Sequence, residues 1–86
     1  MGELTSLPNI GEKLESQLTE AGITTIEALQ RAGSREAWLR ILAVDPSACV
    51  TRLFALEGSI QGVRWHDLPD GTKRSLRDFC KSHKGK

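Results

Sequence analysis

Apolar residues recur at intervals of three and four along most of the chain, with charged and polar residues between them. This spacing places the apolar side chains on one face of an α-helix. No run alternates apolar and polar residues between turn signals, as a half-buried strand would. Glycine and proline interrupt the pattern at short intervals, beside residues that cap helices. The pattern predicts an all-α fold, a compact bundle of about five short helices.

The first two predicted helices are bounded by polar residues and glycines. Asn9 can cap the first helix, with Glu12 as its capping-box partner three residues later, and Gly22 can end it. Thr24 is expected to open the second helix. Gly33 is expected to close it, because glycine readily adopts the left-handed conformation found after helix ends.

Three further helices are predicted in the remainder of the chain. Ser34 is expected to cap the third helix. Asp45 then caps a fourth, which runs from about Pro46 to Gln61, since proline loses nothing at the first helical position. Gly62 ends the fourth helix and Pro69 begins the fifth.

The chain has 86 residues, which is the length of one domain. We therefore expect a single domain over residues 1–86, ordered from about residue 4 to residue 82, with a frayed tail at 83–86. The longest apolar stretches are shorter than a membrane helix needs, so no membrane contact is expected. The two cysteines are too few for a disulfide scaffold, and a reducing cytoplasm is the expected setting.

Charge is distributed unevenly although the net charge is only +1. Residues 1–30 hold five glutamates against one lysine, a net of −4, and residues 31–86 hold eleven basic and six acidic residues, a net of +5. The last predicted helix can expose one basic face, formed by Lys73, Arg74, Arg77, Lys81 and Lys84. This face is either a solvated surface or a nucleic-acid contact.

A short glycine-containing turn near the N-terminus looks like part of a helix-hairpin-helix unit. Its candidate site residues are Asn9, Ile10, Gly11, Glu12 and Lys13. In such units the backbone N–H groups at a helix start can hold a DNA phosphate. The carboxylate of Glu12 and the acidic surroundings oppose that role, because phosphate affinity comes from neutralising cations. The alternative is that Asn9 and Glu12 satisfy the helix start and the turn only packs helices.

The chain as a whole, from about Leu4 to Phe79, resembles the C-terminal domain of the TfoX competence regulators (TfoX/Sxy-like proteins). The residues that carry this resemblance are Leu7–Gly11, Ala21–Ile23, Leu53–Gly62, Trp65 and Leu68–Pro69. The resemblance implies a link to regulation of natural competence in bacteria, through contacts rather than chemistry. With the hairpin, it suggests a SAM-like or helix-hairpin-helix-like N-terminal half.

Two polar or aromatic positions are expected to have structural roles. Glu57 falls inside the apolar stripe of its helix, where a carboxylate is costly unless it is hydrogen-bonded. We expect it to accept a bond from a neighbouring helix start or from the Trp65 indole, although it could also recognise a partner. Trp38 and Trp65 are either core residues or interface anchors.

No residue pattern indicates catalysis. Cys80 and His83 have metal-ligand spacing, but a structural zinc site needs a second close pair of ligands. We expect no cofactor and no metal. The sequence therefore favours a non-enzymatic regulatory or protein–protein interaction module whose partner is another protein. The alternative is a DNA-binding accessory domain that uses the hairpin and the basic last helix.

Overall fold

The computed structural model describes residues 3–84, with the backbone alone for Lys84. Within this range the chain forms four α-helices, two short 3-10 helices and no strand. In chain order these are η1 (Glu3–Ser6), α1 (Glu12–Glu20), α2 (Ile26–Val44), α3 (Val50–Gln61), η2 (Trp65–Asp67) and α4 (Asp70–Lys84). The all-α prediction is confirmed, and the predicted number of helices is not.

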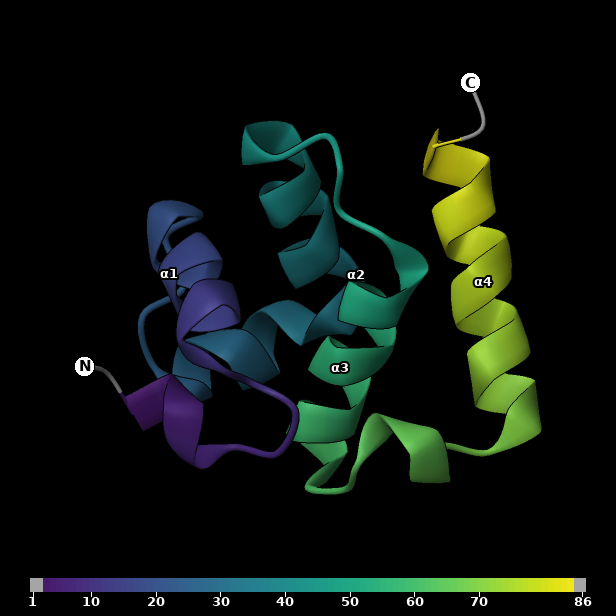
Figure 1. Cartoon of the computed structure of the whole chain (residues 1–86), viewed down its shortest axis with the longest axis horizontal. Coiled ribbons are helices and arrows are strands. Elements are labelled where there is room, and N and C mark those ends of the chain that lie inside the picture. The colour runs from purple at the N-terminus through teal and green to yellow at the C-terminus, as the bar shows by residue number, and fades with distance from the viewer. Residues whose placement is uncertain (1–2, 85–86) are drawn as a thin grey trace.

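The difference in number arises at Gly33, where two predicted helices are joined within α2. Gly33 has φ 82° and ψ 164°, outside the helical region, so it breaks α2 into two parts that run in different directions (Figure 1). Because glycine lacks a Cβ, it adopts this conformation at little cost. The expected stop at Gly33 is therefore a sharp bend within one element.

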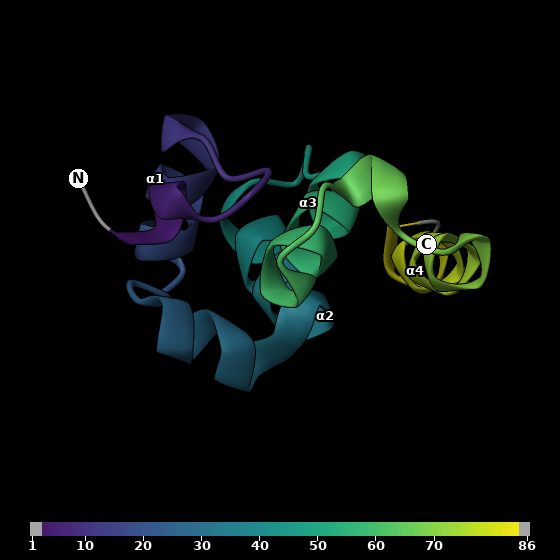
Figure 2. The same ribbon diagram turned by 90° about the horizontal axis from the view of Figure 1, so that it is seen from below.

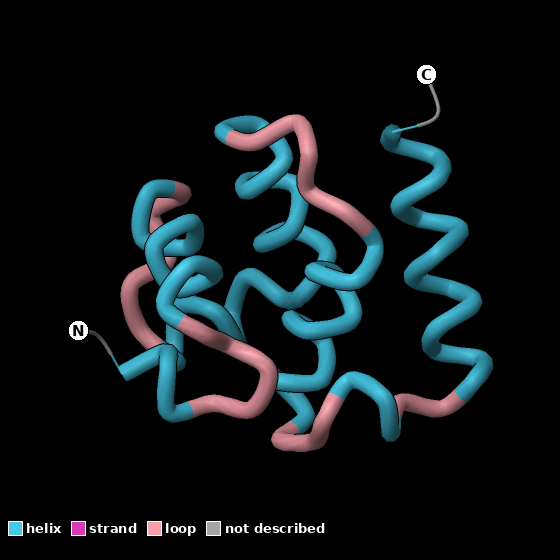
Figure 3. The backbone as a smooth tube through the Cα atoms, in the orientation of Figure 1, coloured by secondary structure: helices cyan, strands magenta, loops and turns pink. Residues whose placement is uncertain are grey.

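The helices are arranged along the longest dimension of the molecule, which extends 33 × 27 × 20 Å. In Figure 1, α1 lies at one end, α2 and α3 form the centre and α4 lies at the other end. The view from below shows the same order (Figure 2). The connections are short loops, drawn in pink in Figure 3. The acidic α1 and the basic α4 therefore lie at opposite ends.

The core lies between α2 and α3 and includes Trp38, the largest fully buried side chain. Its indole N–H donates to the backbone carbonyl of Cys49 at 3.1 Å, and its ring contacts the Phe79 ring of α4 edge-on, 6.1 Å between centroids. Burial of one such large apolar side chain stabilises the fold by about 1.5–3 kcal/mol. The other fully buried large apolar residues are Leu4, Leu18, Ile23, Leu29, Ile41, Leu53, Leu56 and Leu76.

Two predicted helix ends are confirmed in detail. After α1, Gly22 has φ 90° and the N–H of Ile23 donates to the carbonyl of Leu18 at 2.8 Å. After α3, Gly62 has φ 79° and the N–H of Val63 donates to the carbonyl of Gly58 at 2.9 Å. Both ends have the Schellman arrangement, which satisfies carbonyls left over by the last turn.

Predicted helix starts are less accurate. The residue before α1 is Gly11 rather than Asn9, and α2 is capped by Thr25 rather than Thr24, with the Thr25 side chain accepting the N–H of Ala28 at 3.0 Å. The fourth predicted helix begins at Val50 rather than at Pro46. The reason is that the Asp45 side chain holds the following residues in a turn.

In the structure α4 continues as far as Lys84, into the first two residues of the segment 83–86 that the sequence predicts to be a frayed tail. Residues 85–86, which belong to the same predicted tail, lie outside the described residues. At the other end of the chain, Leu4 of η1 is fully buried, a helical turn that the sequence did not predict.

Candidate functional site

The candidate hairpin residues lie in the loop before α1 and in its first turn. Ile10 is buried in the core, whereas Gly11, Glu12 and Lys13 are exposed. Asn9 has φ 70°, a left-handed conformation that asparagine tolerates better than most residues. The hairpin residues therefore divide into an inward anchor and an exposed helix start.

The sequence predicted that the Asn9 side chain caps α1. In the structure it instead reaches the C-terminal end of α3. Its amide donates to the carbonyl of Val63 at 2.9 Å and its oxygen accepts the N–H of Trp65 at 3.1 Å. Gly58 leaves room for this crossing, since a Cβ there would lie 2.6 Å from the Asn9 amide nitrogen. The contact fixes the hairpin against the start of η2.

An open groove of about 460 Å³ lies between the starts of α1 and α3, beside the hairpin. We call it the α1–α3 groove. Its lining comprises Asn9, Gly11, Lys13, Leu14, Gln17, Cys49, Thr51, Arg52, Ala55 and Trp65. Two cationic residues and no acidic residue belong to this lining. Glu12, the residue expected to repel an anion, is absent from it.

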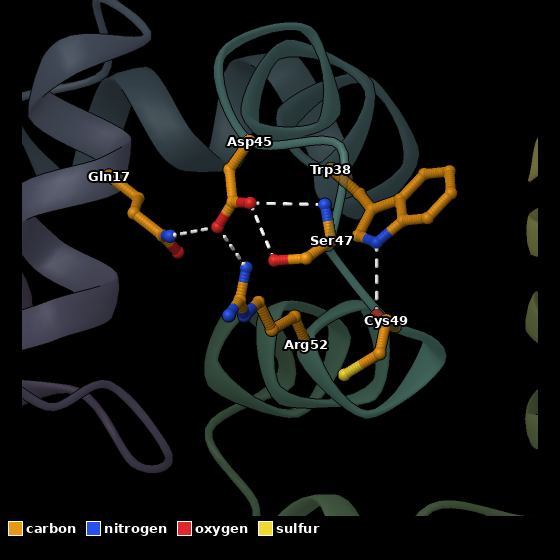
Figure 4. Close-up of polar contacts among 6 residues, drawn as sticks. All are labelled: Gln17, Trp38, Asp45, Ser47, Cys49 and Arg52. Carbon is orange, nitrogen blue, oxygen red and sulfur yellow. Dashed lines mark hydrogen bonds and ion pairs between the residues drawn. The ribbon is translucent and has the colours of Figure 1, made fainter.

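One wall of the groove is fixed by the carboxylate of Asp45 (Figure 4). Its Oδ2 accepts from Gln17 at 2.7 Å and from Arg52 at 2.8 Å. Its Oδ1 accepts the N–H and the hydroxyl of Ser47, at 3.0 and 2.6 Å. These bonds, first from the Ser47 hydroxyl and then from Arg52, hold the pKa of Asp45 well below its ordinary value of 3.8.

Cys49 is the exposed residue that precedes α3, and it lines the groove. Burial raises the pKa of its thiol, but hydrogen bonds from the backbone N–H groups of Arg52 and Thr51 outweigh that effect and lower the pKa below its ordinary value. The sequence did not single out Cys49 for this position, because the predicted helix start at Pro46 placed it inside the first turn.

Trp65 connects the groove to α4 through stacked rings. It is half-buried, and its ring stacks on Phe54 at 5.6 Å and on His66 at 3.8 Å between centroids. Lys73 of α4 donates to the carbonyl of His66 at 2.9 Å, and the Arg77 guanidinium lies 5.6 Å from the Phe54 ring centroid. Two residues of the expected basic face thus contact η2 and α3.

Most of the basic face is exposed. Arg74 and Lys81 are solvent-exposed on α4, as is Arg77 despite its contact with Phe54, and the side chain of Lys84 lies outside the described part of the chain. Although α4 and α1 lie at opposite ends of the molecule (Figure 2), Lys73 of the basic face binds η2, whose Trp65 N–H donates to Asn9 of the hairpin.

Glu57 is half-buried on α3 and accepts hydrogen bonds from two side chains. Ser34, directly after the bend in α2, donates to Oε1 at 2.5 Å, and Gln61 donates to Oε2 at 2.5 Å. Ser34 is only 3% exposed. The hydrogen-bond donor to Glu57 is therefore Ser34, at the start of the second part of α2, and not the Trp65 indole.

Within residues 3–84, no three or more His, Cys, Asp or Glu side chains gather in a way that could hold a metal ion. Cys80 is buried, and Nδ1 of His83 lies 2.9 Å from the carbonyl of Phe79. None of the helices in this part of the chain combines the length and apolar character needed to cross a bilayer.

One known protein family matches almost the whole of this chain. The model of the TfoX C-terminal domain matches residues 1–80. The chain belongs to the TfoX C-terminal domain family. Protein Sxy of Escherichia coli (strain K12) is 34% identical over 79 residues, which is 92% of this chain and 38% of Sxy. The chain therefore corresponds to well under half of that competence regulator.

Solved structures of similar sequence share the fold. A crystal structure of an uncharacterised protein from Listeria monocytogenes, in a triclinic form, is 49% identical with a TM-score of 0.94, covering 95% of this chain and 93% of that one. A protein of unknown function from the same organism, in a tetragonal form, is also 49% identical with a TM-score of 0.89, covering 91% of this chain and 96% of that one. At these TM-scores, the arrangement of helices is a property that this chain shares with experimentally determined structures.

Proposed function

We propose that this chain is a non-enzymatic regulatory module of the competence-regulator type, which acts in the cytoplasm by binding another protein. The observation that carries the proposal is the family match over residues 1–80, together with the relationship to Sxy. The exposed charges add support, because α1 and α4 present opposite charges at opposite ends of a small molecule. Such surfaces select a partner and orient it.

A hybrid of Sxy tests this function. The segment of E. coli Sxy that matches this chain is replaced by the chain itself, and transcription of competence genes is measured in cells that lack Sxy. We expect the hybrid to support transcription within a few-fold of native Sxy. A matched control carries an unrelated helical domain of similar length and is expected to be inactive. A hybrid that folds and accumulates normally but is as inactive as this control would contradict the proposal.

A second candidate function is that of a DNA-binding accessory domain, favoured by the exposed Arg74, Arg77 and Lys81 on one side of α4. A DNA contact through three cations predicts that binding weakens with salt, with a log–log slope of about −3. Changing all three residues to Glu should then abolish the binding. Lys73 is excluded from this triple variant, since it is only partly exposed and donates a hydrogen bond to His66 of η2. Absence of binding to duplex and single-stranded DNA at low salt would eliminate this candidate.

A further inference from the structure

The α1–α3 groove has an apolar floor within a polar rim. The floor is formed by Leu14, Ala55 and the half-buried ring of Trp65. A concave site of this volume falls within the range typical of ligand sites. It accommodates one or two side chains, and a DNA duplex is too wide to enter it. The shape therefore favours an extended or helical peptide that inserts an apolar side chain.

The electrostatic character of the rim is positive. Lys13 and Arg52 are the charged residues of the lining. Lys13 takes part in none of the ion pairs formed among the described side chains, whereas Arg52 shares its charge with Asp45. The N-termini of α1 and α3, helices of 9 and 12 residues, both lie at the groove and add their partial positive charges. A segment that carries carboxylates complements this rim.

We propose that the α1–α3 groove binds an acidic peptide segment of a partner protein, with an apolar side chain of the segment on the groove floor. This inference rests on the proposed function, since it names the surface and the partner chemistry of the same interaction module. The acidic segment places carboxylates near the rim cations Lys13 and Arg52.

The test uses the full chain and three synthetic peptides, with fluorescence anisotropy as the measurement. One peptide intersperses Asp and Glu with Leu and Trp, the second replaces its apolar residues by Ser, and the third replaces its acidic residues by Lys. We expect the first peptide to bind and the other two to bind at least tenfold more weakly. Equal binding of the first two peptides would overturn the proposal, because the groove floor would then play no part.

Variants locate the binding on the molecule. Lys13→Glu should weaken binding of the first peptide by about fivefold to tenfold, and Arg74→Glu, the same charge change on exposed α4, should leave it unchanged. Thr51→Trp, which fills the groove from its exposed edge, should abolish binding, whereas Ser82→Trp on α4 should not. Circular dichroism and thermal melts confirm that each variant is folded. Binding that is weakened by Arg74→Glu and not by Lys13→Glu would also overturn the proposal.

The Sxy hybrid tests the groove as a docking site separately from the regulatory function on which that inference rests. If the hybrid is active, introducing Lys13→Glu together with Thr51→Trp should inactivate it. Continued activity of that double variant rejects the groove as the docking site and leaves the regulatory function standing. Failure of the unmodified hybrid contradicts the function itself. Duplex DNA that competes with the first peptide for the groove would instead assign the site to nucleic acid.

Discussion

The side-chain amide of Asn9 occupies the space that a Cβ at position 58 would need, and residue 58 is glycine. Such a Cβ would lie 2.6 Å from the Asn9 amide nitrogen and 2.8 Å from the carbonyl oxygen of Val63. Real Cβ atoms do not approach other atoms this closely, so Gly58 is required by the hairpin contact. The hairpin is thereby held just beyond the end of α3, by a bond to Val63, which is 54 residues away along the chain from Asn9.

Replacing Gly58 by alanine should therefore destabilise the fold, even though alanine favours a helix over glycine by about 1 kcal/mol. Overpacking of a filled site costs about 1–3 kcal/mol, so after the gain in helix propensity we expect a net loss of up to about 2 kcal/mol in urea unfolding. Gly71→Ala is the matched control, because a Cβ there meets nothing within 4 Å. A Gly58→Ala variant as stable as Gly71→Ala would show that the Asn9 contact does not constrain the fold.

Asp45 should make stability depend on pH in the acid range. The folded state lowers the pKa of Asp45 below its ordinary value of 3.8, so folding favours the ionised carboxylate. The contribution of the ionised Asp45 carboxylate to the free energy of unfolding is fully present above the ordinary pKa of 3.8. It is lost as the pH falls below 3.8 toward the lowered pKa of the folded state. Asp45→Asn should be less stable than the wild type at pH 7, and this difference in stability should become smaller as the pH is lowered. Urea midpoints measured from neutral to acid pH check this, and a constant gap would contradict it.

Glu57 should stabilise the bend in α2 through Ser34. Glu57→Leu leaves the buried Ser34 hydroxyl without its acceptor, which we expect to cost about 1–3 kcal/mol. Glu57→Gln retains an oxygen acceptor and should cost less. In a Ser34→Ala background the Glu57→Leu penalty should shrink, which a double-mutant cycle measures. Undiminished stability of Glu57→Leu would show that the carboxylate has no structural role.

Cys49 should be the more reactive of the two thiols. Its exposed thiol has a lowered pKa at the start of α3, whereas Cys80 is only 7% exposed. Alkylation at neutral pH, followed by mass spectrometry, should modify Cys49 first, because the thiolate is the reacting form. Arg52→Gln should shift the pH midpoint of this reaction upward. Faster modification of Cys80 would contradict the arrangement around the groove.

Local rules predicted the parts of the fold that depend on neighbouring residues. The helix end at Gly22 followed from spacing alone, since the Schellman end observed there involves only one turn of chain. Gly62 was predictable for the same reason. At Gly33 the rule identified the break in the helix but not that the two parts continue as one bent element.

The groove could not be predicted in this way. The role of Asn9 depends on Val63 and Trp65, which are distant in sequence, so its side chain was assigned to the nearest helix start instead. Because Asp45 holds the following residues in a turn, α3 begins only at Val50. Cys49 therefore precedes the helix and lines the groove. Gln17 carried no sequence signal, because its burial follows from the packing of α1 against the α2–α3 loop.

Amide chemical shifts of the full chain show whether the molecule works by binding a protein segment. The chain is titrated at low salt with the acidic apolar peptide and, separately, with duplex DNA. We predict that the peptide causes the largest shifts, at Gly11, Lys13, Thr51, Arg52 and Ala55. Shifts confined to α4 and caused only by DNA would contradict it.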